Sequence, residues 1–183
     1  MKNRNNTLPL ISALIVVSVQ FGCAMPFVAP TSGPTAKIRV VMTKDDYIIH
    51  TDIFLNGMCK GKQTLGVLGK EGAFGPEGKG EASTLNMFDG KTIWDPKRKE
   101  RIVQAERPLT IGLVAVGGYG FQLYRCNQDV TFVPKKNSEY EVRHDINDKI
   151  CILEVNELTL ASDGAVKRTP VEDVQRENRR CWW

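Results

Sequence analysis

The sequence has little of what enzymes and nucleic-acid-binding proteins usually display. It contains only two histidines, and the absence of a Gly-x-Ser-x-Gly motif excludes the nucleophile elbow of an α/β-hydrolase. The five cysteines are widely separated and none lies beside a histidine, which disfavours a zinc site. The 25 basic and 21 acidic residues nearly balance, with no basic cluster of the kind that indicates nucleic-acid binding. We therefore predict no metal, no other cofactor and no nucleic-acid partner.

Long apolar runs are also scarce. The longest covers residues 8–21 and is shorter than the roughly 20 apolar residues that a membrane-spanning helix needs. It follows the basic residues Lys2 and Arg4 and precedes small residues, which is the layout of a secretory signal peptide. We predict a signal peptide over residues 1–22 and export of the remainder.

A cysteine lies where this apolar run ends. Gly22-Cys23 resembles the lipobox of bacterial lipoproteins, in which a small residue precedes a cysteine that is acylated and becomes the mature N-terminus. Gln20 and Phe21 depart from that pattern. The resemblance implies lipid attachment at Cys23 and, with Ala24 rather than aspartate next, the outer membrane, facing the periplasm. The competing prediction is cleavage after Ala24, which would release a soluble periplasmic or secreted protein without Cys23.

The mature chain divides into two parts. Residues 23–36 contain Pro26, Pro30 and Pro34 among small polar residues, a composition that favours a spacer. We predict a lipidated cysteine followed by a proline-rich tether over this range. Residues 37–183 then form one domain, long enough to bury a hydrophobic core.

The domain shows the residue pattern of β-strands. Apolar residues alternate with others over 38–43, 49–55 and 139–146. Further segments are short and rich in β-branched or aromatic residues: 109–116, 119–125, 130–133 and 149–155. Turn signals separate these segments: Asn56-Gly57, Gly117-Gly118 and residues 135–138. We predict a mainly β fold, an antiparallel two-sheet β-sandwich of about seven to eight strands.

One helix is expected at the C-terminal end. Thr169-Pro170-Val171-Glu172 matches a capping box with proline at the first helical position. This pattern predicts a short helix at about residues 170–180. Few of its residues are apolar, so we expect Cys181 and Trp182-Trp183 to hold it against the domain.

The cysteines indicate disulfides. Four remain once Cys23 is lipidated or removed, and four cysteines allow three pairings. We favour Cys126 with Cys151, which brackets an expected hairpin, and Cys59 with Cys181, which would fix the C-terminal tail.

Two charged or glycine-rich stretches are predicted to be ordinary surface. Residues 69–83 are rich in glycine, but Gly80 follows Lys79 where a P-loop needs Ser or Thr, so we expect a flexible loop. The basic cluster at 97–101 is interrupted by Glu100 and is predicted to be a solvated turn.

Few side chains suggest chemistry. His50 and Asp52 share one face of an expected strand, as an acid–base pair could, whereas His144 falls on an apolar face and is expected to be structural. Trp94 and Tyr119 are candidates for the rim of a ligand site. None of these forms a convincing catalytic set, and we predict that the protein is not an enzyme.

Two functions remain in competition. Residues 125–140 combine a cysteine, an apolar strand, a turn and a tyrosine-bearing strand, and with Gly22-Cys23 they resemble small envelope lipoproteins of Gram-negative bacteria. That resemblance implies an anchored protein with a binding or structural role toward another envelope protein. The alternative is a released β-sandwich that binds a carbohydrate or another small ligand.

Overall fold

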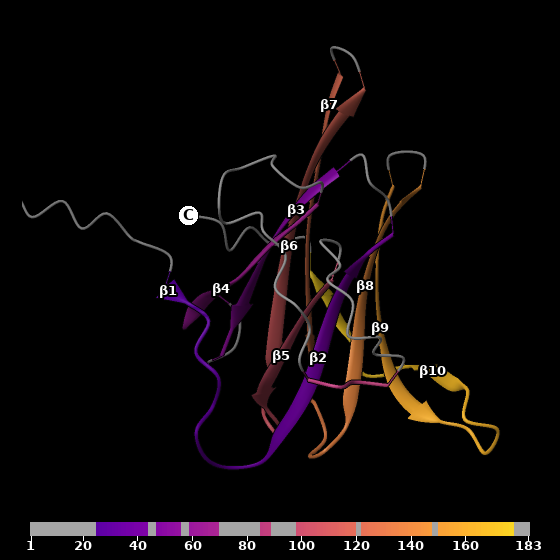
Figure 1. Cartoon of the computed structure of the whole chain (residues 1–183). Coiled ribbons are helices and arrows are strands. Elements are labelled where there is room, and N and C mark those ends of the chain that lie inside the picture. The colour runs from indigo at the N-terminus through magenta and orange to yellow at the C-terminus, as the bar shows by residue number, and fades with distance from the viewer. Residues whose placement is uncertain are drawn as a thin grey trace, which may run out of the picture.

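The computed structural model describes residues 25–43, 47–55, 59–69, 85–88, 98–119, 122–147 and 150–177. These residues form eleven strands in two sheets, and none of them is helical (Figure 1). The strands are β1 (Met25–Pro26), β2 (Thr35–Met42), β3 (Tyr47–Phe54), β4 (Lys62–Leu68), β5 (Arg98–Gln104), β6 (Leu109–Tyr119), β7 (Gln122–Phe132), β8 (Glu139–Asn147), β9 (Ile150–Leu160), β10 (Val166–Pro170) and β11 (Gln175–Glu177). The predicted mainly β fold is confirmed. The strands outnumber the predicted seven to eight because β1, β4, β5, β10 and β11 were not among the predicted segments, whereas two of the predicted segments belong to one strand. No described segment could cross a bilayer as a helix.

The strands are arranged in a sandwich-like fold. One sheet, sheet A, has the order β1-β4-β3-β6-β7-β11, and the other, sheet B, has the order β10-β9-β8-β2-β5. Most neighbours are antiparallel, but β1 pairs with β4 and β2 pairs with β8 in parallel. The prediction of wholly antiparallel sheets is therefore wrong at these two pairs. Side chains alternate with period two in either direction, so the residue pattern could not reveal them.

The inner faces of both sheets form one hydrophobic core. Sheet B contributes Ile38 and Val40 from β2, and sheet A contributes Ile111 and Leu113 from β6, all fully buried. On β8, the predicted inner residues are all buried: Tyr140, Val142, His144 and Ile146. The period-two interpretation of residues 139–146 is thus confirmed for the face that it assigned to the core.

The hairpin between β6 and β7 is longer than the sequence indicated. Gly117-Gly118 does not form a turn but continues β6, pairing with Tyr124 and Leu123 of β7. The strands predicted at 119–125 and 130–133 are one strand. Glycine weakens a strand but does not have to end it, which explains the error. The turn at 135–138 is confirmed, with Asn137 in the left-handed region at φ 61°.

The chain docks on sheet A from its first described residue. Beyond the parallel pair of β1 and β4, the Phe27 N–H donates to Thr64 O at 3.1 Å. The Val28 N–H donates to the side-chain oxygen Oε1 of Gln63 at 3.0 Å. Phe27 also packs against the core. The beginning of the predicted tether therefore lies against the domain.

Part of the outer face of sheet B is covered by another segment of the chain. Residues 85–88 lie across β2 and β8, as the short pink segment in Figure 1 shows. Lys37 Nζ donates to Leu85 O at 2.9 Å, and the Phe88 N–H donates to Glu139 Oε2 at 2.7 Å. Met87 is almost fully buried. The 85–88 segment covers Glu139, and Arg39 and Arg168 contact Glu141, so both carboxylates are buried although they point away from the core.

A buried charge network lies beneath the 85–88 segment. Arg39 is only 1% exposed, and its Nε lies 3.1 Å from Glu100 Oε1. Its Nη1 lies 3.5 Å from Glu141 Oε2, and its Nη2 donates to Phe88 O at 2.7 Å. The solvated turn predicted at 97–101 is therefore wrong over 98–101, where the chain forms β5 and buries Glu100.

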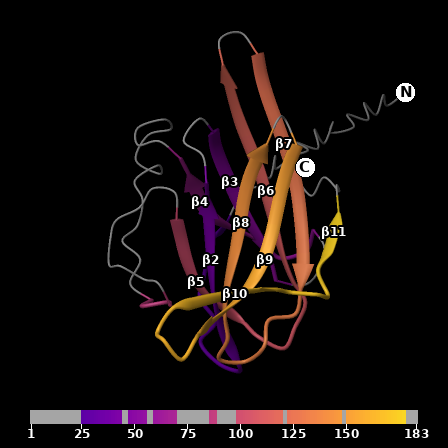
Figure 2. The ribbon, with the colours of Figure 1, turned by 90° about the vertical axis from the view of Figure 1, so that its right-hand side faces the viewer.

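The helix expected at 170–180 is also wrong over its described part. After β10 the chain crosses from sheet B to sheet A, where β11 pairs with β7 (Figure 2). The Val171 N–H donates to Val155 O at 2.9 Å, and Val171 and Val174 pack against the core. These contacts outweigh the capping signal, because a short helix with so few apolar residues has little to stabilise it. Residues 178–180 lie outside the described ranges.

One predicted disulfide is confirmed. Cys126 of β7 and Cys151 of β9 are bonded, with their Cα atoms 6.1 Å apart, and thus link sheet A to sheet B rather than bracket a hairpin. Cys59 is also disulfide-bonded. Cys181 lies outside the described residues, so its pairing with Cys59 stays a prediction.

Candidate binding site

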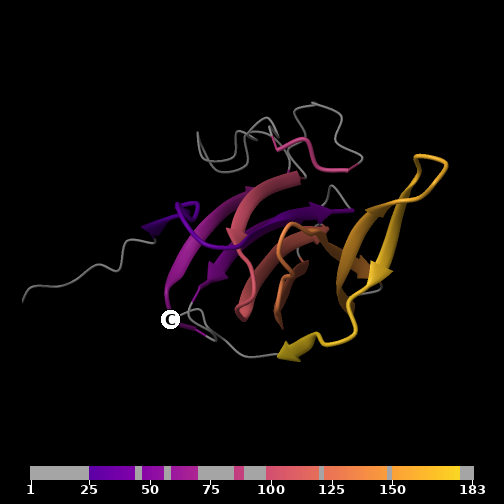
Figure 3. The ribbon, with the colours of Figure 1, turned by 90° about the horizontal axis from the view of Figure 1, so that it is seen from below.

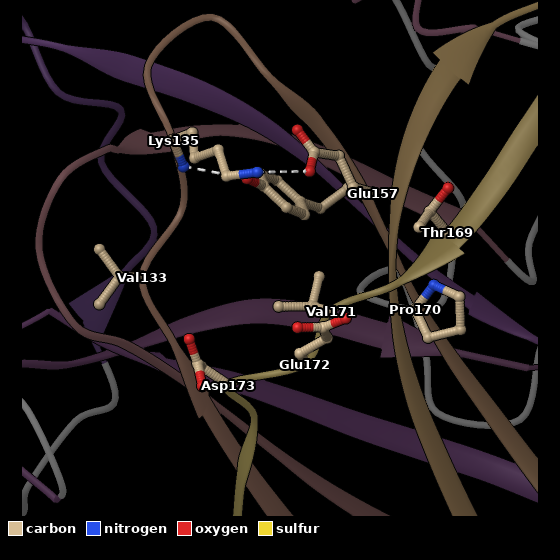
Figure 4. A pocket seen from close by; sticks show the side chains of 9 residues that line it. Val133, Lys135, Glu157, Thr169, Pro170, Val171, Glu172 and Asp173 are labelled. Atoms are coloured by element: carbon tan, nitrogen blue, oxygen red, sulfur yellow. Dashed lines mark hydrogen bonds and ion pairs between the residues drawn. The ribbon is translucent and has the colours of Figure 1, made fainter.

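A pocket of about 390 Å³ opens at the edge where the chain crosses from sheet B to sheet A (Figure 4). This volume lies within the range of small-ligand sites, roughly 300–1,000 Å³. The residues that line this edge pocket are Val133, Lys135, Tyr140, Glu157, Thr169, Pro170, Val171, Glu172 and Asp173. They come from β8, β9 and β10, from the turn after β7 and from the crossing segment, so the pocket depends on several parts of this edge.

Tyr140 gives the edge pocket a fixed apolar wall. Its ring is buried and packs on Phe132, with the ring centroids 5.2 Å apart. Its hydroxyl accepts a hydrogen bond from the Lys135 N–H at 2.9 Å, which ties the turn after β7 to the start of β8. Val133, Pro170 and Val171 supply the other apolar surface.

An ion pair lies on one side of the edge pocket. Lys135 Nζ is 3.0 Å from Glu157 Oε2, and the Ser138 hydroxyl donates to Glu157 Oε1 at 2.9 Å. Partial burial would raise the pKa of Glu157, but the bonds from Lys135 and Ser138 outweigh it and hold that pKa below its usual value. The same contact with Glu157 raises the pKa of Lys135. Both groups are therefore charged at neutral pH.

Two further carboxylates lie on the opposite side. Figure 4 shows Glu172 and Asp173 across the opening from Lys135 and Glu157. Val171 lies between these two charged pairs. Both are exposed, and neither forms an ion pair with any residue that the structure describes. The edge pocket thus combines an apolar wall with three carboxylates and one ammonium group.

The sequence-predicted pair His50 and Asp52 is brought together on the outer face of sheet A. His50 Nε2 lies 3.2 Å from Asp52 Oδ1, and Lys62 Nζ lies 3.0 Å from Asp52 Oδ2. The Thr64 hydroxyl donates to Asp52 Oδ1 at 2.8 Å. Complete burial would raise the pKa of Asp52, but the bonds from His50, Lys62 and Thr64 together lower it. Asp52 is therefore an ionised carboxylate with three partners, an arrangement that suits a structural ion cluster.

His144 lies on the core face of β8, as predicted. Its Nε2 is 3.6 Å from Cys126 Sγ. A disulfide sulfur carries no hydrogen, so the ring nitrogen must be the donor in this contact. Burial lowers the pKa of His144 to about 4, against a smaller opposite effect of Asp145. His144 is neutral at physiological pH.

The buried His144 predicts how stability depends on pH. An unfolded histidine has a pKa near 6.5, so the unfolded chain takes up the proton first as the pH falls. The contribution of His144 to the free energy of unfolding is complete above about pH 6.5 and is lost progressively between pH 6.5 and 4. We expect a loss of about 3 kcal/mol from this group over that window.

Guanidinium unfolding at a series of pH values measures this loss. His144→Met should flatten the pH dependence between pH 6.5 and 4, whereas His50→Gln, which retains His144, should keep the steep part. Equal slopes in His144→Met and the unchanged protein would contradict the assignment.

Other predicted site residues are not tested. Cys23 and Trp94 lie outside the described residues, and Tyr119 ends β6, with nothing described of its side chain. Among the residues that the structure does describe, no three His, Cys, Asp or Glu side chains form a group that could hold a metal ion.

Sequence reasoning missed the edge pocket. Residues 169–172 matched a helix cap, and 135–138 matched a turn, but neither pattern indicates that the two segments meet. The one available signal is the spacing of Val171 and Val174, which bracket Glu172 and Asp173. Two valines three residues apart could dock a crossing segment while leaving the acidic residues between them exposed.

No family model, no curated protein and no solved structure matches this chain.

Proposed function

We propose that this chain is a lipid-anchored, non-enzymatic protein of the bacterial envelope, attached through Cys23, whose domain binds another envelope protein at the edge pocket. The observation that supports this proposal is the position of the pocket relative to the start of the described chain. β1 forms one edge of sheet A, whereas the pocket is lined by residues of β8, β9 and β10 and of the segment that follows β10. Figure 3 shows β1 and β10 on opposite sides of the molecule.

Anchoring at this end would orient the domain. Only Ala24 separates Cys23 from β1, which is docked on β4. Acyl chains on Cys23 contribute about 0.8 kcal/mol of membrane affinity per buried CH₂ group, and several chains make the attachment durable. The β4 edge would then lie near the membrane, and the edge pocket would open away from it toward a partner.

The contacts of two carboxylates, Asp52 and Glu157, support a binding role rather than a catalytic one. Asp52 is occupied by His50, Lys62 and Thr64, and Glu157 is occupied by Lys135 and Ser138. An acid–base catalyst needs a group that can exchange a proton with a substrate near neutral pH. Hydrogen bonds that stabilise the charged form of each carboxylate oppose such an exchange.

The intact mass of the mature protein tests the anchor. Protein purified from the membrane fraction is expected to begin at Cys23 and to carry additional acyl mass, and Cys23→Ser is expected to remove it from that fraction. A chain that begins at Met25 without lipid would overturn the anchored form and favour the released ligand-binding alternative.

Site-specific photo-crosslinking tests the binding surface. A photoreactive residue in place of Val133, which is exposed in the pocket, should give an adduct of one defined size in intact cells. Val116 is also exposed but lies on β6, outside the pocket, and is the matched control. Equal adducts from both positions, or none from Val133, would argue against the pocket as the binding surface.

A further inference from the structure

We infer that the edge pocket binds a positively charged alkyl group, the ammonium or guanidinium end of a lysine or arginine side chain on the partner protein. This inference rests on the proposed function and names the chemistry that its site would recognise. It is carried by the combination of a pocket of about 390 Å³, an apolar wall and an excess of carboxylates.

The charge of the lining favours a cation. The pocket has three carboxylates, on Glu157, Glu172 and Asp173, and one ammonium group, on Lys135. That ammonium is bonded to Glu157, so two negative charges remain without an ion pair among the described residues. An incoming cation would meet both on the side opposite Lys135, as Figure 4 shows.

The apolar wall decides what kind of cation fits. Val133, Pro170 and Val171 offer carbon surface beside the carboxylates. Lysine and arginine carry their charge on a methylene stem that packs on such surface. A bare metal ion would leave this surface unused.

Lys135 shows the interaction within the chain itself. Its ammonium reaches Glu157 at 3.0 Å while 73% of its side-chain surface stays exposed. It therefore occupies the rim and leaves the interior open. It also neutralises one carboxylate that a ligand could use, so the removal of its charge should strengthen the binding of an external cation.

Amide NMR titration of the mature protein in detergent micelles tests this inference. The probe is N-acetyl-lysine methylamide, and N-acetyl-norleucine methylamide is the neutral control with a similar stem. We expect saturable shifts at Val133, Lys135, Glu157 and Val171 with the lysine probe and much weaker ones with norleucine. Equal affinity for both probes, or no saturable shift, would overturn the inference.

Charge variants sharpen the test. Glu172→Gln and Asp173→Asn should each weaken binding about threefold to fivefold, and the double variant about tenfold, because exposed ion pairs contribute modestly. Lys135→Met should strengthen binding about threefold. Glu154→Gln changes the net charge equally on the outer face of β9 and should have no effect. If Glu154→Gln weakened binding as much as Glu172→Gln, the effect would depend on the net charge of the protein and not on the pocket, and the assignment would be overturned.

The source of the cation is tested by a second probe. This probe is 1,5-diaminopentane, a free amine. If it binds more tightly than the lysine probe, the ligand is a free amine and the assignment to a protein side chain is overturned. Failure here is distinguishable from failure of the proposed function. A defined crosslinked adduct at Val133, together with equal affinities for the lysine and norleucine probes in the NMR titration, would refute the binding of a cation. It would leave the edge pocket as the binding surface.

Discussion

Replacement of Arg39 by alanine is expected to lower the free energy of unfolding by about 3–5 kcal/mol, the cost of leaving buried partner charges uncompensated. Glu100 and Glu141 would lose the guanidinium group that lies 3.1 and 3.5 Å from them, and Phe88 O would lose its 2.7 Å hydrogen bond. Arg39→Lys should recover little, because one ammonium group cannot serve three acceptors that surround a planar guanidinium. Urea unfolding with linear extrapolation measures the change.

Arg168 provides the matched control for Arg39. It binds the same Glu141 carboxylate through two bonds of 2.9 and 3.2 Å, but about a third of its side-chain surface is exposed. Arg168→Ala should therefore cost about 1 kcal/mol or less. If Arg39→Ala cost no more than Arg168→Ala, burial would not be the source of the effect.

Removal of the disulfide between the two sheets is the second large effect. Cys126→Ala with Cys151→Ala should lower the free energy of unfolding by about 3–4 kcal/mol, because the bond closes a loop of 25 residues and restricts the unfolded chain. Guanidinium unfolding of the oxidised proteins measures the difference. An unchanged unfolding midpoint would show that the core alone fixes the two sheets.

The same double variant also tests the other predicted pair. If Cys59 is bonded to Cys181 and Cys23 is lipidated, the denatured but unreduced variant should show no free thiol. Two thiols would refute that pairing. Thiol titration before and after reduction gives the count directly.

Sequence patterns predicted which segments form strands better than they predicted which other segments cover the faces of those strands. Alternation over 139–146 correctly placed Tyr140 and Val142 on the core face, because one buried face imposes a period of two. It gave no sign that the alternate residues Glu139 and Glu141 are buried as well, Glu139 by contact with the 85–88 segment and Glu141 by contact with Arg39 and Arg168. The pattern within a strand reports which residues share a face, and what covers that face depends on distant parts of the chain.

The candidate site depended still more on distant contacts. The expectation that Cys126 and Cys151 pair needed only that two strands lie near each other. The edge pocket requires the crossing segment to meet the turn after β7, and the local signal at Thr169 favoured a helix instead. Glu172 was assigned to the capping box, and Asp173 showed no motif, since acidic residues occur on many surfaces.

The parallel pairing of β2 with β8 has a consequence for how an exported chain folds. Lys37 and Glu139 are neighbours in this pair but lie 102 residues apart in sequence. If the chain is exported as proposed and enters the periplasm from its N-terminus, it presents β2 long before β8, and contacts of such separation form slowly. Sheet B must then wait for most of the chain to be translocated. During that interval β2 has an open edge, which makes it the segment for which a periplasmic chaperone would matter most.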